Sequence, residues 1–361
     1  MASNAKMRIN HSPTALLAGV DNLLLDNRKF DPSRDDIENI CRFFSIGKLL
    51  HYEKEKGINV SHSNFFVFVV TSHGEYALKF YPKYAAQIIT IEFALNRILA
   101  IHHFQTPNMY TCHGAQPFFT SNDLLATCYS YINGVPACHH IKQRNTIRQI
   151  NAAMLSLKNI LSTTKGHLPF LKQASQGPYA GMFLTTINNL VQESRLIAPY
   201  DPKKVIDTTL QDACQTYQRH QLLFTRQWLH NNANLTNFLI YKKTIYTLDL
   251  SHVQEDYVLS DLASLVISCL FLDITKTTIK AIVKDYFTQH KIKSEHFLVL
   301  NTLVKIGLIK EYLKIIRREK SIELPTYPPD LVRTYLFHSS ARKKSITALL
   351  KKMVDSARFI V

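Results

Sequence analysis

Glycine is scarce in this chain: only 10 of 361 residues are glycine, less than half of the usual share of about 7%. Collagen-like repeats and glycine-rich linkers are therefore excluded. Acidic residues are also few, with 27 Asp and Glu against 43 Lys and Arg, which gives a formal net charge of +16. The remaining composition is that of a globular protein, since 46% of the residues are hydrophobic and 19% are charged. A mainly disordered or fibrous chain is excluded by that balance.

The six cysteines are scattered along the chain and include no C-x-x-C pair. Disulfide frameworks are typical of smaller secreted chains, so we expect reduced thiols and a cytoplasmic location. The longest apolar stretch is Leu262–Leu272, about half the length that a membrane-spanning helix needs. The sequence therefore predicts no transmembrane segment and no metal site built on cysteine.

The first third of the chain is rich in strand patterns. Residues 1–32 are interpreted as an N-terminal extension, and Ser33 is expected to cap the helix that follows it. The elements expected next are strands over Leu49–Tyr52, Asn64–Thr71 and Glu75–Tyr81, a helix over Ile88–Ala100, and strands near Met109–His113 and Leu124–Tyr131.

Helical patterns dominate after Gly134. They cover His139–Ser162, Gly181–Leu196, Pro202–His220 and the chain from about Leu259 onward, with a strand-like interlude over Phe238–Asp249. A length of 361 residues favours two domains or one two-lobed unit. We therefore predict an α+β fold with a small antiparallel β-sheet lobe over residues 33–133 and a large helical lobe over residues 134–361.

The strongest functional signal is the segment Trp228–Ile240 (WLHNNANLTNFLI). It is followed by a strand pattern that ends at Asp249 and by the helix start Ser260-Asp261-Leu262-Ala263. This arrangement resembles the catalytic segment of the aminoglycoside phosphotransferase, type II homoserine kinase and choline kinase group, which has a protein-kinase-like two-lobe fold. That group has H-G-D-x-x-x-x-N, then a strand ending in D, then D-L-A. The matching positions here are His230, Asn237, Asp249 and Asp261.

The resemblance implies a role for each matching residue. Phosphoryl transfer needs a group that orients the attacking hydroxyl and oxygen ligands that hold Mg²⁺ against the phosphates. Asn237 and Asp249 are the implied Mg²⁺ ligands. Asp261 is implied to fix the catalytic loop, and His230 is expected to be structural and to pack beneath that loop.

The chain departs from the group at the catalytic aspartate, whose position is taken by Asn232, and at the neighbouring glycine, replaced by Asn231. An amide accepts a hydrogen bond from a hydroxyl but cannot take its proton. General-base assistance is worth roughly 10²–10⁴-fold, whereas positioning and charge neutralisation carry most of a loose phosphoryl transfer. We therefore expect Asn232 to orient the hydroxyl in a slow or repurposed enzyme. A plain loop-capping role for Asn232 remains the alternative.

The expected N-lobe has its own partial match. The run Gly57–Val67 (GINVSHSNFFV) resembles the homoserine kinase pattern G-x-x-N-x-N-Y-x-V. The resemblance implies that backbone N–H groups and the hydroxyls of Ser61 and Ser63 hold the phosphates of ATP. Ordinary turn residues are the alternative for both serines. The length of the polar loop and helix after Asp249 also favours the homoserine kinase branch.

Four further residues match nucleotide-binding positions of the fold. Lys79 stands where the strand lysine that contacts the α- and β-phosphates is expected, and Glu92 is its implied ion-pair partner. Taken alone, the two are an ordinary strand lysine and helix glutamate. Tyr129 and Tyr131 belong to the expected hinge, whose backbone contacts adenine.

These observations predict a phosphotransferase that uses ATP and Mg²⁺ and acts on a hydroxyl of a small molecule, of the homoserine kinase or aminoglycoside phosphotransferase type. Asn232 keeps open a nucleotide-binding pseudokinase or a regulatory interaction module. Residues 273–361 hold 18 basic and 8 acidic residues, so the basic C-terminal helices are candidates for contact with an acidic partner. No nucleic-acid motif is present, and we expect no nucleic-acid partner. The acceptor is not identified by the sequence.

Overall fold

A computed structural model of the chain describes residues 32–54, 65–112, 114–121, 124–164, 182–196, 203–272 and 274–320. The described residues of 32–54, 65–87 and 110–129 form one compact unit, called the sheet unit below. Those of 88–109 and 130–320 form a second, the helical unit. Ser61, Ser63, the N-terminal extension up to residue 31 and the basic segment after residue 320 lie outside the described residues.

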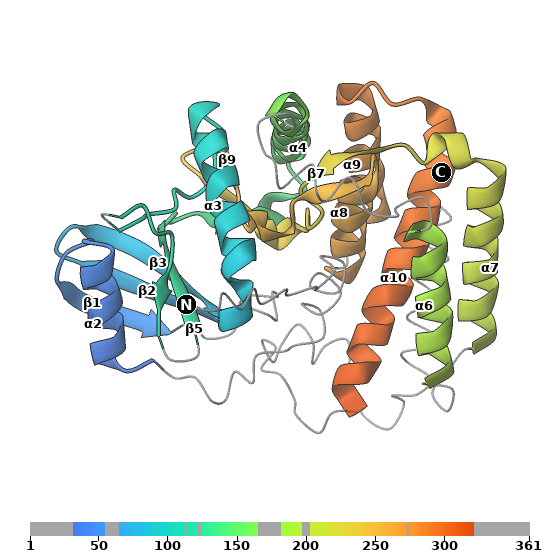
Figure 1. Cartoon of the computed structure of the whole chain (residues 1–361). Helices are drawn as coiled ribbons and strands as arrows, with labels where there is room; N and C mark the ends of the chain where they lie inside the picture. The colour runs from blue at the N-terminus through green and yellow to red at the C-terminus, as the bar shows by residue number, and fades with distance from the viewer. Residues whose placement is uncertain are drawn as a thin grey trace, which may run out of the picture. The chain divides into compact units, whose positions relative to one another are not determined.

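The sheet unit is a five-stranded sheet in the order β1-β2-β3-β5-β4, with helix α2 packed against it (Figure 1). Ser33 caps α2 as predicted: its Oγ accepts from Asp36 N at 3.1 Å, and Asp36 Oδ2 accepts from Ser33 N at 2.9 Å. The buried face of α2 packs on the strand residues Val67 and Leu78. The elements are α2 Arg34–Phe43, β1 Leu49–Lys54, β2 Phe65–Thr71, β3 Gly74–Pro82, β4 Phe119–Thr120 and β5 Leu124–Ser130.

The turn between α2 and β1 depends on Gly47. Its φ is +98°, and a Cβ built on it would lie 2.6 Å from Ser72 Oγ and 3.0 Å from His73 N. Lys48 N also donates to Ser72 Oγ at 3.0 Å, so the close approach joins this turn to the β2–β3 hairpin. We expect Gly47→Ala to lower the free energy of unfolding by about 1–3 kcal/mol, because it adds both backbone strain and a clash.

Chemical denaturation of the full chain, followed by circular dichroism, measures that loss. The matched control is Gly114→Ala, whose Cβ would meet only Cys112 Sγ at 4.0 Å. Equal midpoints for the two variants would show that the turn can rearrange without cost.

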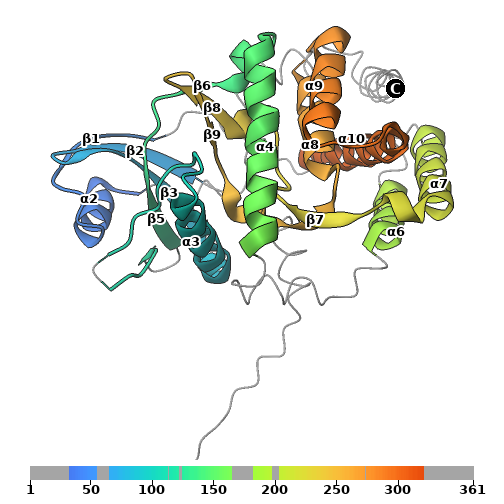
Figure 2. The same cartoon turned by 90° about the horizontal axis from the view of Figure 1, so that it is seen from above.

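The helical unit surrounds a short β-region. Helices α6, α7 and α10 run side by side (Figure 1), and α4 lies between the β8–β9 hairpin and α9 (Figure 2). The largest apolar core fills this unit. Its elements are α3 Ala86–Ile101, β6 Val135–Pro136, α4 Arg144–Thr164, α6 Met182–Leu196, α7 Lys203–Arg219, β7 Arg226–Leu229, β8 Phe238–Tyr241, β9 Thr244–Thr247, β10 Gln254–Tyr257, α8 Ser260–Phe271, α9 Lys276–Gln289 and α10 Phe297–Lys320.

The turn between β8 and β9 is made of two lysines. Tyr241 pairs with Thr244, so Lys242 and Lys243 alone form the loop. Their φ values are +48° and +66°, the left-handed geometry of a type I′ turn. Gln149 Nε2 donates to Lys243 O at 2.7 Å and links the turn to α4.

Most predicted elements are present, but two expectations are wrong and one pair of strands was not predicted. Met109 is a single bridging residue rather than the start of a strand, because Cys112 N turns back to Gln116 O at 3.2 Å. The helix predicted from His139 begins at Arg144, after a short 3₁₀ helix. Strands β7 and β10 were not predicted, because each has four residues and pairs with a segment about 30 residues away. None of the described helices is long and apolar enough to cross a membrane.

Candidate active site

The segment that carries the sequence motif is a polar loop between β7 and β8 in the helical unit. Strand β7 ends at Leu229, and a 3₁₀ helix over Leu235–Asn237 leads into β8. Trp228, Leu235 and Phe238 are buried on either side of the loop. Burial of these apolar side chains fixes both ends, so the polar residues between them have defined positions.

Asp261 holds the first half of this loop from the first turn of α8. Its Oδ2 accepts from His230 N at 3.1 Å and its Oδ1 from Asn231 N at 2.7 Å. The side chain is 2% exposed. Burial raises the pKa of Asp261 to about 7, against the opposing effect of the two N–H donors, with Asp256 raising it further. Asp261 thus accepts from two backbone N–H groups of the loop, and its role in fixing a catalytic loop stays a prediction.

His230 joins the loop to the end of β9. Its Nε2 lies 2.8 Å from Leu248 O, which only accepts, and its Nδ1 accepts from Asn232 N at 3.2 Å. The ring is therefore the neutral tautomer that carries its proton on Nε2. Burial lowers the pKa of His230, which agrees with that neutral state. Both ring nitrogens therefore make hydrogen bonds to backbone atoms.

The backbone explains why asparagine is accepted at position 231. Asn231 has φ +59°, in the left-handed region. Asparagine occupies that region more readily than other residues with a Cβ. The loop therefore keeps a left-handed conformation at this position without a glycine.

Three of the predicted site residues are joined by hydrogen bonds between this loop and the end of β9. Asn237 Nδ2 donates to Asn232 O at 2.8 Å, which leaves Asn237 Oδ1 as the atom that can face a cation. Asp249 follows β9 in a left-handed conformation, with φ +57°. Asn232 Nδ2 donates to Asp249 Oδ2 at 3.0 Å. Asn232, Asn237 and Asp249 are thus linked through Asn232.

Three neighbours of these residues were not among the predicted site residues. Ser251 Oγ donates to Asp249 Oδ1 at 2.7 Å, and His252 Nε2 lies 3.6 Å from Asp249 Oδ2. Asn234 Nδ2 donates to Asn232 Oδ1 at 2.9 Å. The one available signal was the position of Asn234 before the 3₁₀ helix, since asparagine is a preferred N-cap.

The donor set suits a hard divalent cation. Asn237 Oδ1 and the Asp249 carboxylate are oxygen ligands of the kind that Mg²⁺ prefers. Within the described ranges, no group of three or more His, Cys, Asp or Glu side chains could hold a metal ion. A cation at Asp249 would therefore take most of its ligands from water or from phosphate oxygens, as Mg²⁺ does in nucleotide sites.

The predicted nucleotide-binding residues lie in both units. In the sheet unit, Lys79 is 2% exposed on β3, with Nζ 4.8 Å from the ring centroid of Tyr81. Tyr129, near the end of β5, is buried, and its hydroxyl lies 3.4 Å from that of Tyr81. In the helical unit, Glu92 is 3% exposed on α3, and Tyr131 is 40% exposed. The Lys79–Glu92 ion pair and the adenine contact stay predictions.

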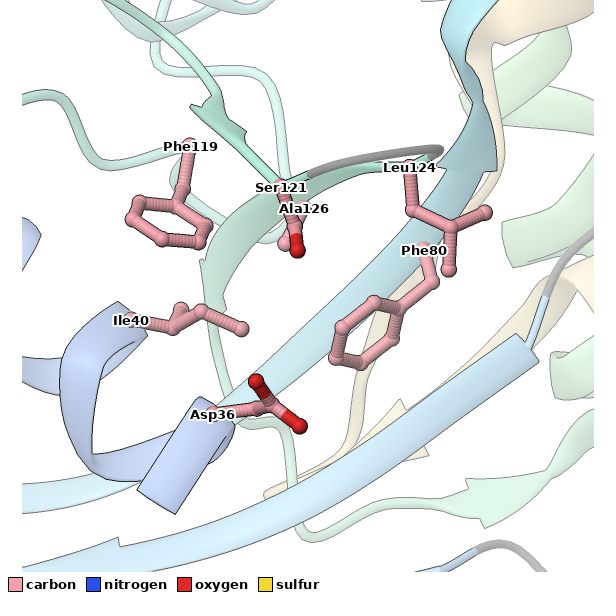
Figure 3. Close-up of a pocket in the computed structure, with 7 residues that line it drawn as sticks. All are labelled: Asp36, Ile40, Phe80, Phe119, Ser121, Leu124 and Ala126. Carbon is pink, nitrogen blue, oxygen red and sulfur yellow. The ribbon is translucent and has the colours of Figure 1, made fainter. Parts of the chain in front are cut away.

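A small cavity in the sheet unit is a separate feature (Figure 3). Asp36 and Phe80 point toward each other across it. Its volume of about 10 Å³ suits one water molecule and is too small for a nucleotide. The Asp36 carboxylate already accepts from Ser33. This cavity is therefore not a candidate for the functional site.

No protein-family model and no curated protein matches the sequence. Among solved structures, an amicoumacin kinase in complex with AMP-PNP, Ca²⁺ and Ami matches with a TM-score of 0.63 and 12% identity over 91% of this chain and 95% of that chain. A choline kinase from Cryptosporidium parvum Iowa II matches with a TM-score of 0.58 and 14% identity over 91% and 96%. An aminoglycoside phosphotransferase from Alicyclobacillus acidocaldarius matches with a TM-score of 0.55 and 12% identity over 93% and 99%. The predicted protein-kinase-like α+β fold is confirmed.

Proposed function

We propose that this protein is a phosphotransferase that moves the γ-phosphoryl group of ATP to a hydroxyl of a small molecule. The observation that carries the proposal is the linkage of Asn232, Asn237 and Asp249 in one loop region, held by Asp261 and His230. The fold supports it, because the solved structures that share it are named as kinases of small molecules. One of them was solved with an ATP analogue and a divalent cation.

In this proposal Asn237 Oδ1 and Asp249 would hold Mg²⁺, which neutralises phosphate charge when bound. Lys79 would contact the α- and β-phosphates, with Glu92 as its partner. Ser61 and Ser63, which lie outside the described residues, are proposed to contact the phosphates as well. The backbone near Tyr129 and Tyr131 would contact adenine.

Asn232 would orient the acceptor by accepting a hydrogen bond from its hydroxyl at Oδ1. The acceptor oxygen forms the new bond to phosphorus, the bond from phosphorus to the β–γ bridging oxygen breaks, and ADP leaves. The hydroxyl proton passes to water or to a phosphoryl oxygen, because an amide cannot take it. We expect a slow enzyme for that reason.

An acceptor screen with ATP and MgCl₂ tests the proposal on the full chain. Amino-acid alcohols such as homoserine are the first class to test, and aminoglycosides the second. We expect phosphate incorporation into at least one class above a no-acceptor control. If calorimetry detects no ATP binding in the presence of MgCl₂, the proposal is contradicted.

A nucleotide-binding pseudokinase is the second candidate, and Asn232 is the observation that favours it. Binding of ATP with no turnover on any acceptor is its expected result in the same screen.

We further propose a cytoplasmic location and an acidic partner for the basic C-terminal segment. Of the basic region over residues 273–361, residues 274–320 are described and include α9 and α10, and residues 321–361 lie outside the described residues. Binding of an acidic peptide that weakens with salt would support this partner.

A further inference from the structure

A chain of hydrogen bonds runs from a backbone N–H to the carboxylate of Asp249. Thr236 N donates to Asn234 Oδ1 at 3.0 Å. Asn234 Nδ2 then donates to Asn232 Oδ1 at 2.9 Å, and Asn232 Nδ2 donates to Asp249 Oδ2 at 3.0 Å. Both ends fix the direction, because a backbone N–H only donates and a carboxylate only accepts. Each amide between them has one orientation that satisfies both neighbours.

The residue at the end of this chain needs such support. Asp249 has φ +57° and ψ +65°, a left-handed conformation that is strained for a residue with a Cβ. Strained conformations persist where surrounding contacts over-determine them. Donors meet both carboxylate oxygens here: Ser251 Oγ at Oδ1, and Asn232 Nδ2 at Oδ2. The carboxylate therefore has a defined direction before any cation binds.

We infer that Asn232 is the central member of a one-way hydrogen-bond relay that holds Asp249 in its metal-binding conformation, with Asn234 as a positioning residue. The inference rests on the proposed function, since it assigns roles at the same site. Asn232 Oδ1 has a second lone pair, so the same amide can hold Asp249 and accept from a hydroxyl. Asn232 then has a positioning function of its own, which an aspartate at the same position would not provide.

An aspartate at position 232 breaks the relay at its centre. It cannot donate to Asp249 Oδ2, and two carboxylates about 3 Å apart repel each other. A divalent cation between them relieves that repulsion. We therefore expect the stability of the helical unit to depend on a divalent cation in Asn232→Asp, and we expect no such dependence in the native chain without nucleotide.

The first test compares the thermal unfolding of native protein and Asn232→Asp at one fixed pH. Each is melted in EDTA and in MgCl₂ at matched ionic strength, followed by the fluorescence of Trp228, the one tryptophan of the chain. We expect the variant to melt several degrees below native in EDTA and to recover most of the difference in MgCl₂. Equal melting of both proteins in EDTA would overturn the relay.

The second test separates the relay from simple helix capping. Serine is as good an N-cap as asparagine, so Asn234→Ser keeps the cap on the 3₁₀ helix without adding charge, but removes the donor to Asn232. We expect affinity for ATP with MgCl₂ to fall about 10-fold, as for the loss of other partners of metal ligands. Affinity in EDTA and the melting temperature should stay close to native. Native affinity in Asn234→Ser would contradict the positioning role.

Thr236→Val is the matched control, because it removes only the hydroxyl that also donates to Asn234 Oδ1 and keeps the backbone N–H that begins the relay. We expect its ATP affinity with MgCl₂ to stay within about two-fold of native. If the native chain binds no nucleotide, the proposed phosphotransferase function is wrong. The melting comparison of Asn232→Asp in EDTA and MgCl₂ still decides the relay in that case, so the two failures are distinguishable.

Discussion

Asp249→Asn is expected to lower kcat/KM for phosphoryl transfer by about 10³-fold, or ~4 kcal/mol of transition-state stabilisation. The substitution removes the one negative charge of the proposed metal pair Asn237 and Asp249. It keeps one oxygen, which can still accept from Asn232 Nδ2, and the new amide NH₂ can donate to Ser251 Oγ, because a hydroxyl also accepts. Asparagine also tolerates the left-handed backbone at φ +57°. The loss should therefore appear in activity and not in folding. Steady-state kinetics on the best acceptor and thermal unfolding measure the two effects.

Two further variants make this result specific. Asp212→Asn, an exposed residue on α7, removes the same charge at a distance from the loop and should leave kcat/KM unchanged. Asp249→Ala should lose activity and also about 1 kcal/mol of stability, because alanine is strained in a left-handed conformation. Activity of Asp249→Asn within tenfold of native would show that the proposed metal pair is not used.

The second large effect is expected from Asp261→Asn, as a change in how stability depends on pH. Burial raises the pKa of Asp261 to about 7, above its ordinary value of 3.8. The folded protein therefore holds this proton more tightly than the unfolded chain. The resulting stabilisation is complete below about pH 4 and declines as pH rises to about 7, by up to about 4 kcal/mol. The variant lacks this decline.

The same variant loses a hydrogen bond in the loop. An asparagine oxygen accepts from one of His230 N and Asn231 N and leaves the other unpaired, at a cost of about 1–3 kcal/mol. We therefore expect Asp261→Asn to be less stable than native at acidic pH and the gap to narrow toward pH 7. Denaturation followed by Trp228 fluorescence at several pH values measures the gap, with Asp212→Asn as control. A gap that is constant with pH would contradict the raised pKa.

The elements that sequence predicted best are those formed by local patterns. The β2–β3 hairpin follows from alternating aromatic and β-branched residues around one turn, and the first turn of α2 from the Ser33 cap. The β7–β10 pairing was missed because its two short strands lie about 30 residues apart. Periodicity carries no information about such a partner.

The residues of the candidate site could be named from the sequence, but the hydrogen bonds among them could not. His230, Asn237, Asp249 and Asp261 follow from motif spacing, because they stand within about 30 residues of one another. The amide orientation of Asn232 depends on side-chain geometry that spacing does not encode. Compared with the aspartate of the group that the motif resembles, Asn232 lacks a negative charge. The hydrogen bonds show that it also has an N–H donor, which bonds to Asp249.

The two-lysine turn between β8 and β9 has a consequence for engineering. In a chain with so few glycines, Lys242 and Lys243 occupy backbone conformations for which Asn-Gly is the preferred pair. The left-handed conformation costs each of these lysines roughly 1–2 kcal/mol of conformational energy. The pairing of β8 with β9 on either side of the turn overcomes that cost. The hairpin that leads from the loop to Asp249 is thus a place where thermostability can be raised without touching a residue of the proposed site.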